Sequence, residues 1–449
     1  MVRTRSPESA DRIPTDGLGP TPEVSDRSSL GILARVVIVM SAAFGAAYHL
    51  IGVPGLRDIG FYYRIDLDVY RLGGSVFVDG GALYGAMPPT LAGIGLPFTY
   101  PPLAAVVFSP MSVISLEAAG IVLTTLSLLA LLATLALTLA SVGVAPRAML
   151  TWTALAAAAA ALTLEPVYST LDYGQVNILL MAFVAADCLL KKTPWPRGVL
   201  IGFVAAVKLT PAAFVLFFLV RKDFRAAVTA GLSFVAAGAV GFAITRADSW
   251  QYWTHTLFDS GRIGRAAYPP NQSITGVLAR LGVDPSLRSL LWLGLSAAVL
   301  VLAAVAMHRA LAAGATALAL CVNALAALLV SPVSWSHHWV WVAPLLLLVG
   351  VEAYRRRSAL LAAGGLASWA MFVIAPHWRL GEGRWDGTDW PLWDQFLASA
   401  YVWWAVVLMA IVAVSLGRRT RARASTADTE SAYGDAPFGF RRRKTSDTV

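Results

Sequence analysis

The sequence has few charged residues and almost no cysteine. Only 14% of its 449 residues are charged, whereas a soluble domain carries about 25%. Hydrophobic residues make up 57% of the chain, and the mean hydropathy is +0.65. The two cysteines, Cys188 and Cys321, both lie in apolar segments, which excludes a disulfide framework and a cysteine-rich metal cluster. This composition disfavours a soluble enzyme and favours a chain embedded in a membrane.

Motifs for nucleotide and metal chemistry are also missing. The chain has no Walker loop, no glycine-rich dinucleotide turn and no His-Glu-x-x-His sequence. The net charge of +9 does not indicate nucleic-acid binding, because the arginines border apolar segments. An enzyme that uses a soluble nucleotide donor is therefore unsupported, and we expect neither a metal nor a cofactor.

Apolar stretches long enough to cross a membrane recur along the chain. Their Leu, Ala and Val runs lack the two-residue alternation of a membrane barrel, so spanning segments must be helical. At about 20 residues per span, the pattern predicts an all-α, polytopic membrane protein of about twelve segments, some short or broken. The predicted segments lie near 32–53, 100–114, 117–141, 149–165, 176–190, 198–220, 226–245, 286–306, 311–330, 338–351, 358–375 and 398–416.

The two ends of the chain differ from its middle. Residues 1–29 and 420–449 are rich in Ser, Thr, Asp, Arg and Pro and lack apolar periodicity. Such segments cannot bury enough apolar surface to fold, so we predict disordered cytoplasmic tails on either side of a membrane domain, 30–419. The basic C-terminal tail can also touch anionic membrane lipids.

Basic clusters predict the orientation in a cell membrane. The positive-inside rule places the clusters at 221–225, 355–357 and 418–423 in the cytoplasm. Three long polar connections then lie outside, so we expect the chemistry on the extracytoplasmic face. These connections are 54–99, 246–285 and 376–397.

The topology between 97 and 220 is ambiguous. Simple alternation would place Lys191, Lys192 and Arg197 outside, against the positive-inside rule. Two broken or re-entrant segments, 97–116 and 198–220, would remove the conflict. Both contain prolines, which break helices, and irregular backbone at membrane depth is tolerated where it lines a protein cavity.

The most informative stretch, 331–341, contains two adjacent histidines between apolar segments. Polar groups at membrane depth are functional candidates because lipid offers them no partner. His337 and His338 can donate to phosphate or sugar oxygens, and can shuttle protons. Adjacent histidines are a poor metal signature, since a helical chelate prefers i and i+4. The alternative is structural capping.

Two acids stand in the first polar connection. Asp66 and Asp68 are separated by one residue and point to different sides of a helix or strand, so only one faces a given substrate. Desolvation near lipid raises a carboxyl pKa and suits it to general-base catalysis. The alternative is a solvated loop acid paired with Arg64 or Arg71.

Five further residues are candidate substrate ligands. Tyr100 follows a Pro-Phe-Thr sequence that also reads as helix punctuation, and Gln175 and Asn177 can cap a helix or bind a sugar. Lys208, stranded in an apolar run, either binds an anion such as phosphate or snorkels to the interface. Asn271 heads a predicted helix, 273–281, as cap or ligand.

In chain order these residues form a recognisable set. The motifs are Asp66-Leu-x-Val-Tyr, Phe98-x-Tyr100-Pro-Pro, Gly174-Gln-x-Asn177, Lys208-x-x-Pro211, Asn271-Gln-Ser and Ser331-Pro-x-Ser-Trp-x-His-His. Over about 32–416 the chain resembles the polyprenol-phosphate-mannose-dependent alpha-1,2-mannosyltransferases of glycosyltransferase family 87, actinobacterial membrane enzymes of the GT-C fold that act in phosphatidylinositol mannoside and lipomannan synthesis.

The resemblance implies a function and a division of roles. Mannose would pass from polyprenol-phosphate-mannose to a mannolipid or lipoglycan acceptor, forming an alpha-1,2 linkage with inversion. Asp66 matches the catalytic base, while Lys208, His337 and His338 would stabilise the leaving phosphate. Arg262 and Arg265 are the substitutes if that phosphate site lies elsewhere.

Two other functions stay open at this point. Related arabinofuranosyltransferases, which use a polyprenol-phosphate arabinose donor, share the Tyr-Pro-Pro, Lys-Pro and Asn-x-Ser elements. A transporter or flippase for lipid-linked sugars would also need a polar site in the membrane. The His-His pair favours the mannosyl branch, and the lack of internal repeats favours an enzyme over a transporter.

Overall fold

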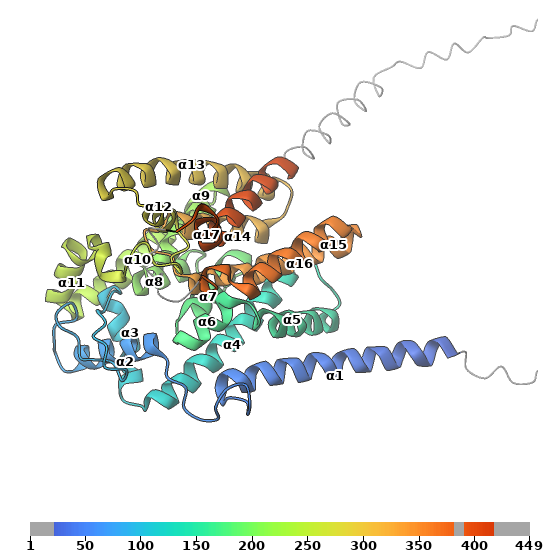
Figure 1. Cartoon of the computed structure of the whole chain (residues 1–449), viewed down its shortest axis with the longest axis horizontal. Coiled ribbons are helices and arrows are strands. Elements are labelled where there is room, and N and C mark those ends of the chain that lie inside the picture. The colour runs from blue at the N-terminus through green and yellow to red at the C-terminus, as the bar shows by residue number, and fades with distance from the viewer. Residues whose placement is uncertain (1–21, 381–389, 417–449) are drawn as a thin grey trace, which may run out of the picture.

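The computed structural model describes residues 22–380 and 390–416, and every regular element in these ranges is a helix (Figure 1). The α-helices are α1 (Pro22–Leu50), α2 (Ile65–Val78), α3 (Pro102–Ser112), α4 (Leu116–Ser141), α5 (Arg147–Ala161), α6 (Glu165–Tyr173), α7 (Asn177–Leu189), α8 (Val199–Val207), α9 (Val215–Val220), α10 (Phe224–Ile244), α11 (Arg246–Thr254), α12 (Ile274–Arg280), α13 (Pro285–Ala312), α14 (Thr316–Val330), α15 (Val342–Arg356), α16 (Ala359–Ile374), α17 (Leu392–Ala398) and a last helix, Ala400–Leu416. Short 3₁₀ helices are η1 (Thr210–Phe214), η2 (Thr256–Phe258), η3 (Ser260–Ile263), η4 (Ser336–Trp341) and η5 (Pro376–Trp378).

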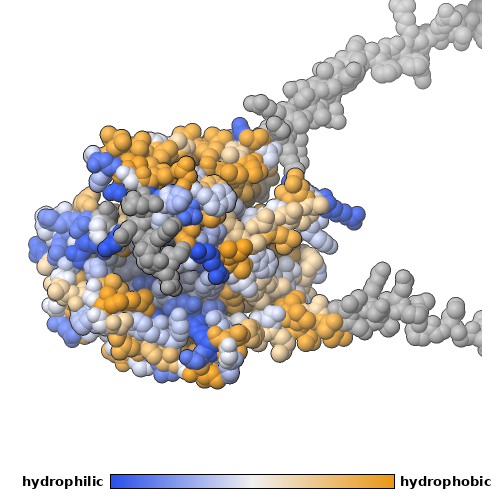
Figure 2. All heavy atoms as spheres, viewed as in Figure 1, coloured by the Kyte–Doolittle hydropathy of each residue, from blue (hydrophilic) through white to orange (hydrophobic). Residues whose placement is uncertain are grey.

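The long apolar helices identify a membrane protein. Five are long and apolar enough to cross a membrane, or up to seven if each of two bent pairs counts as one span. Figure 2 shows hydrophobic side chains over α13, where Leu290 and Val301 are 69% and 65% exposed. Exposed apolar surface of this kind suits lipid contact. The all-helical prediction is confirmed for the described residues, whereas the predicted count of about twelve segments is not.

Two predicted breaks take a definite form. Helix α8 ends at Val207, Lys208 is extended with φ −143° and ψ 121°, and η1 begins at Thr210. Pro211 explains the break, because it lacks an N–H to continue the helix. The segment 97–116 is likewise extended before α3, which starts at Pro102.

The predicted polar connections are more regular than expected. The stretch 54–99 contains α2, so Asp66 lies in a helix within the predicted polar connection. The stretch 246–285 contains α11, η2, η3 and α12, and α12 matches the predicted helix 273–281. The predicted C-terminal tail lies outside the described residues, as does most of the N-terminal one, although α1 already begins at Pro22.

Close packing holds neighbouring helices together. Helix α8 lies along α10, α2 against α3, and α13 against α14. The α8–α10 contact depends on Gly202, where a Cβ atom would stand 2.2 Å from the Ala230 carbonyl oxygen. Small residues that let backbones approach are the usual basis of helix association in membranes.

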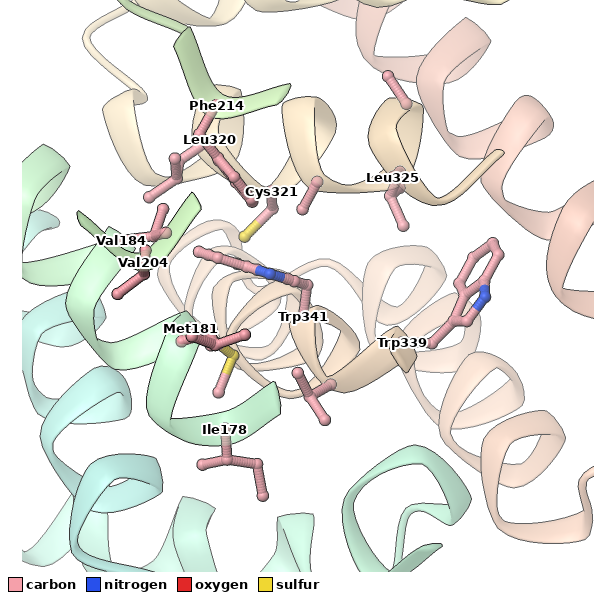
Figure 3. Close-up of a cluster of buried hydrophobic side chains, with 14 of the residues drawn as sticks. Ile178, Met181, Val184, Val204, Phe214, Leu320, Cys321, Leu325, Trp339 and Trp341 are labelled. Atoms are coloured by element: carbon pink, nitrogen blue, oxygen red, sulfur yellow. The ribbon is translucent and has the colours of Figure 1, made fainter. Parts of the chain in front are cut away.

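A buried apolar cluster packs around η4, the segment that carries the two histidines. It contains Ile178, Met181 and Val184 of α7, Val204 of α8, Phe214 of η1, Leu320, Cys321 and Leu325 of α14, and Trp339 and Trp341 of η4 (Figure 3). Trp339 is fully buried, and its ring packs 5.5 Å from that of Tyr401. Burying a large apolar side chain is worth roughly 1.5–3 kcal/mol relative to water. The indoles therefore anchor η4, and with it the histidines.

Candidate active site

A cavity of about 730 Å³ gathers residues from distant parts of the chain. It lies where α2, the segment before α3, the α6–α7 turn, the break after α8 and η4 meet. Six of the eight predicted site residues line it, namely Asp66, Tyr100, Gln175, Lys208, His337 and His338.

The two candidate acids have different surroundings. Asp66 lies in the first turn of α2 and faces the cavity. Asp68 is 4% exposed, and its Oδ2 accepts hydrogen bonds from the Leu91 backbone N–H at 2.7 Å and the Tyr63 hydroxyl at 3.2 Å. Asp68 therefore holds the loop that follows α2, and Asp66 is the acid available to a ligand.

The protonation of Asp66 is tuned by opposing effects. Burial raises the pKa of Asp66 to about 6, against the lowering effects of a hydrogen bond from Gln175 and the nearby Lys208 charge. The start of α2 adds positive helix-dipole potential, which favours the carboxylate. A carboxyl group with a pKa near neutrality is matched to general-base work.

Gln175 connects the groups of the cavity. Its Nε2 donates to Asp66 Oδ2 at 2.9 Å, and its Oε1 accepts from Lys208 Nζ at 3.1 Å and from the Tyr70 hydroxyl at 2.6 Å. The Tyr100 hydroxyl lies 3.2 Å from that of Tyr70 and 3.4 Å from Gln175 Nε2. One amide side chain thus sets the positions of an acid, a cation and two hydroxyls.

Gly174 makes this arrangement possible. It ends α6 with φ +71°, a left-handed conformation that favours glycine. A Cβ atom there would stand 2.7 Å from Leu67 Cβ, on α2. The turn therefore lies directly against α2 and brings Gln175 to Asp66.

Lys208 is held inside the protein. Its side chain is buried, with Nζ 2.8 Å from Asn177 Oδ1 and 5.5 Å from the centre of the Tyr100 ring. The snorkelling alternative is therefore wrong. Within the described residues no carboxylate lies within 4.0 Å of Nζ. An ammonium has three donors, and the two amide oxygens leave one for a ligand in the cavity.

The two histidines are not equivalent. His337 is buried, and its Nε2 has no hydrogen-bond partner among the described residues. Its ring packs 5.0 Å from that of Tyr173, while its backbone carbonyl accepts from Thr170 at 2.6 Å and Asn177 at 3.0 Å. His338 is half-buried and lines both this cavity and a smaller apolar one. A buried nitrogen without a partner needs an explanation, and on a residue that lines a cavity a ligand contact is a candidate.

The structure does not bring Asn177 and Asn271 to the cavity. Asn177 does not line the cavity. Its Oδ1 accepts a hydrogen bond from Lys208 Nζ, and its Nδ2 donates to the His337 carbonyl. Asn271 is fully buried, and its Oδ1 accepts from the Ser334 backbone N–H at 3.0 Å and from Ser273 at 2.9 Å. Neither side chain caps a helix, because α12 is capped by Ser273 and α7 has no side-chain cap. The predicted direct ligand role of Asn271 is therefore unsupported, and so is the capping alternative.

Sequence reasoning missed a buried acid beside the site. Glu165 is fully buried and accepts hydrogen bonds from Ser336, Trp378 and Tyr401 at 2.7–3.0 Å. It ties α6 to η4, η5 and the last helix. Its position at the end of the apolar run 149–165 is the same signal that singled out Lys208, and could have found it.

The cavity can therefore support group transfer that needs one base and an anion site. Arg262 also lines it, whereas Arg265 does not. No group of three or more His, Cys, Asp or Glu side chains among the described residues could hold a metal ion.

Comparisons with known proteins agree with this chemistry. The family model for glycosyltransferase family 87 matches residues 98–332. The chain is 42% identical over 369 residues to the polyprenol-phosphate-mannose-dependent alpha-(1-2)-phosphatidylinositol mannoside mannosyltransferase of Mycobacterium tuberculosis, covering 80% of this chain and 86% of that protein. It is 43% identical to the protein of the same name from Mycolicibacterium smegmatis, over 83% of this chain and 90% of the relative.

More distant relatives carry a related name. A polyprenol-phosphate-mannose-dependent alpha-(1-2)-phosphatidylinositol pentamannoside mannosyltransferase of Mycolicibacterium smegmatis is 33% identical, over 80% of this chain and 88% of that protein. No solved structure matches the chain. The family match and the identities, taken with the cavity, show that the chain is a membrane glycosyltransferase and belongs to glycosyltransferase family 87.

Proposed function

We propose that the protein transfers mannose from polyprenol-phosphate-mannose to a phosphatidylinositol mannoside or a related lipoglycan, forming an alpha-1,2 linkage with inversion. The names of the relatives support the donor and acceptor classes. The higher identity to the phosphatidylinositol mannoside enzymes favours that acceptor over the pentamannoside, at 42–43% against 33–34%.

One observation carries the mechanism, namely that Asp66 and Lys208 contact opposite ends of the same Gln175 amide. Asp66 accepts the proton of the acceptor hydroxyl while the oxygen of that hydroxyl bonds to the anomeric carbon of the donor. The bond from that carbon to the donor phosphate breaks, and the phosphate keeps the electron pair. Lys208 and His337 then bind the phosphate oxygens, where negative charge grows, and stabilisation that grows with that charge accelerates the step.

The proposal includes a GT-C type membrane domain, 30–419, of about twelve segments with several short or broken helices. Four apolar helices too short for a straightforward span support this reading, namely α3, α7, α14 and the stretch Thr210–Val220. The cavity would open on the extracytoplasmic face of the cell membrane, because Arg221 and Arg355–Arg357 lie at the opposite ends of their helices.

Thiol labelling tests the orientation. The native cysteines, Cys188 and Cys321, are buried and give a low background. A membrane-impermeant reagent applied to intact cells should label Ala82→Cys, beyond α2, and spare Arg356→Cys, at the end of α15. Labelling of Arg356→Cys from outside would overturn the extracytoplasmic site.

A transfer assay tests the activity. Membranes containing the protein receive polyprenol-phosphate-mannose with a radiolabelled sugar and a phosphatidylinositol mannoside acceptor. We expect a labelled mannolipid from which an alpha-1,2-specific mannosidase releases the labelled mannose. Transfer from the corresponding arabinose donor instead would identify an arabinofuranosyltransferase. Movement of the intact donor across the membrane of vesicles, without transfer of its sugar, would identify a transporter.

A further inference from the structure

A second cavity, of about 460 Å³, lies beside the first. Ile65, Tyr173 and Trp378 line both, so the two chambers share a wall next to Asp66. The second chamber lies between the segment before α2, helix α6 and η5. Its size falls within the range of small-ligand pockets, about 300–1,000 Å³.

The lining of the second chamber differs from that of the first. Four tyrosines and Trp378 line it, together with Ser169 and Asp172. No lysine, arginine or histidine is among its described lining residues, whereas Lys208, Arg262 and both histidines line the first chamber. The second chamber therefore lacks a phosphate receptor, and its hydroxyl and carboxylate oxygens do not suit a hydrocarbon chain.

We infer that this second chamber is a subsite for the non-reacting sugar residues of the acceptor glycan. Sugars present hydroxyls that bond to Asp172 and Ser169, and C–H faces that pack on aromatic rings, whose faces carry partial negative charge. Asp172 Oδ1 is occupied by Arg57 at 2.9 Å, and no described residue donates to its Oδ2. The carboxylate is thus fixed in place with one oxygen available to a ligand.

The position of the chamber suits this role, which rests on the proposed function. In an in-line displacement the acceptor approaches from the side opposite the leaving phosphate. The wall that the two chambers share contains Ile65, the residue directly before Asp66, so an acceptor whose reacting hydroxyl lies at Asp66 is next to this wall. The rest of the acceptor glycan then has the aromatic chamber beside it. The enzyme would select acceptors that carry several sugars.

Tyr168 offers the clearest test. It lines only the second chamber, it is half-buried, and its hydroxyl has no hydrogen bond among the described residues. Tyr168→Ala removes one stacking ring, and Tyr168→Phe retains it. Trp250→Ala, at an exposed aromatic of α11 outside both cavities, is the matched control.

The assay compares two synthetic acceptors, octyl mannoside and the octyl glycoside of a linear mannotriose. We expect Tyr168→Ala to raise the KM for the trisaccharide by about 2- to 10-fold. Its kcat, and the KM for the monosaccharide, should stay unchanged, because the monosaccharide does not reach Tyr168. Tyr168→Phe and Trp250→Ala should match the wild type. Equal losses with both acceptors, or no change with the trisaccharide, would overturn the subsite.

A binding measurement separates this inference from the proposed function. Saturation-transfer NMR with methyl mannotrioside and purified protein needs no donor and no turnover. We expect saturation of the sugar protons in the wild type, a weaker signal at the same ligand concentration in Tyr168→Ala, and an unchanged signal in Trp250→Ala. A wild type that binds the sugar but does not transfer mannose would refute the activity and support the subsite. Equal saturation in wild type and Tyr168→Ala would refute the subsite alone.

Discussion

The side-chain amide of Gln175 donates to Asp66 Oδ2 at 2.9 Å and keeps that carboxylate facing the cavity. The contact joins two residues separated by 109 positions in sequence. A buried carboxylate with one hydrogen bond from an amide keeps its other oxygen for a substrate proton. This relationship leads to the first two predictions.

Asp66→Asn should abolish transfer while the protein still folds and inserts. The amide is close in size to the carboxylate but cannot accept the proton, and loss of a general base costs about 100- to 10,000-fold. Asp68→Asn is the control, because Asp68 bonds to Leu91 and Tyr63 and should mainly affect stability. Initial rates of transfer, measured for both variants at equal amounts of protein, test whether Asp66 is the base. Near-normal turnover in Asp66→Asn would rule out its role as base.

The rate should depend on pH through the same residue. Burial raises the pKa of Asp66 to about 6, and only the deprotonated form acts as a base. The value of kcat/KM should therefore fall as pH drops through about 6, whereas an ordinary aspartate would stay active to about pH 4. Gln175→Leu removes a hydrogen bond that favours the carboxylate, so its profile should move to higher pH. A profile flat through pH 6 in the wild type would contradict the assignment.

Lys208→Met should lower kcat by about 100- to 1,000-fold and raise the KM for the donor, because the stem remains but the charge is lost. Negative charge grows on the phosphate as the sugar departs, so the larger effect falls on turnover. Lys191→Met is the control, since Lys191 is exposed and lines neither cavity. Transfer rate against donor concentration gives both constants. Wild-type kinetics in Lys208→Met would show that Lys208 does not bind the phosphate. Arg262, which lines the same cavity, would then be the next candidate.

Replacing the histidines one at a time should give unequal losses. His337 lines the cavity and carries a buried Nε2 without a partner among the described residues, whereas His338 is half-buried. His337→Ala should therefore lose more activity than His338→Ala. The His337 backbone contacts with Thr170 and Asn177 persist in the variant, so folding should not explain the loss. Comparable rates in both variants, with unchanged thermal stability, would contradict this ordering.

Much of this site could be predicted from local sequence signals. Lys208 and the two histidines stand out because an ionisable group in an apolar run is costly to place in a membrane and is therefore a functional candidate. The choice between Asp66 and Asp68 could not be made from spacing, because it depends on Leu91 folding back over α2. The role of Asn271 could not be predicted for a similar reason. Its partners are Ser334, 63 residues away, and the backbone of its own loop. Pairing over such distances leaves no periodic trace in the sequence.

The helix pattern was harder to predict where helices are short. An apolar run reads the same whether it spans a membrane straight, bends or breaks. The run at 149–165 ends in a 74° bend between α5 and α6, set around buried Glu165. The run at 198–220 could be divided correctly because Lys208 and Pro211 mark its break.

The last prediction concerns Gly174, where conformation and contact coincide. Gly174→Ala forces a left-handed residue to carry a Cβ atom, at about 1–2 kcal/mol, and drives that atom against Leu67. The α6–α7 turn must then move away from α2, which breaks the hydrogen bond between Gln175 and Asp66. We expect a lower melting temperature in detergent together with a loss of kcat. Gly231→Ala, in α10 with nothing within 4 Å of its added Cβ, should leave activity unchanged and stability equal or slightly higher. If Gly174→Ala melted and turned over like the wild type, the α6–α7 turn would not be what positions Gln175.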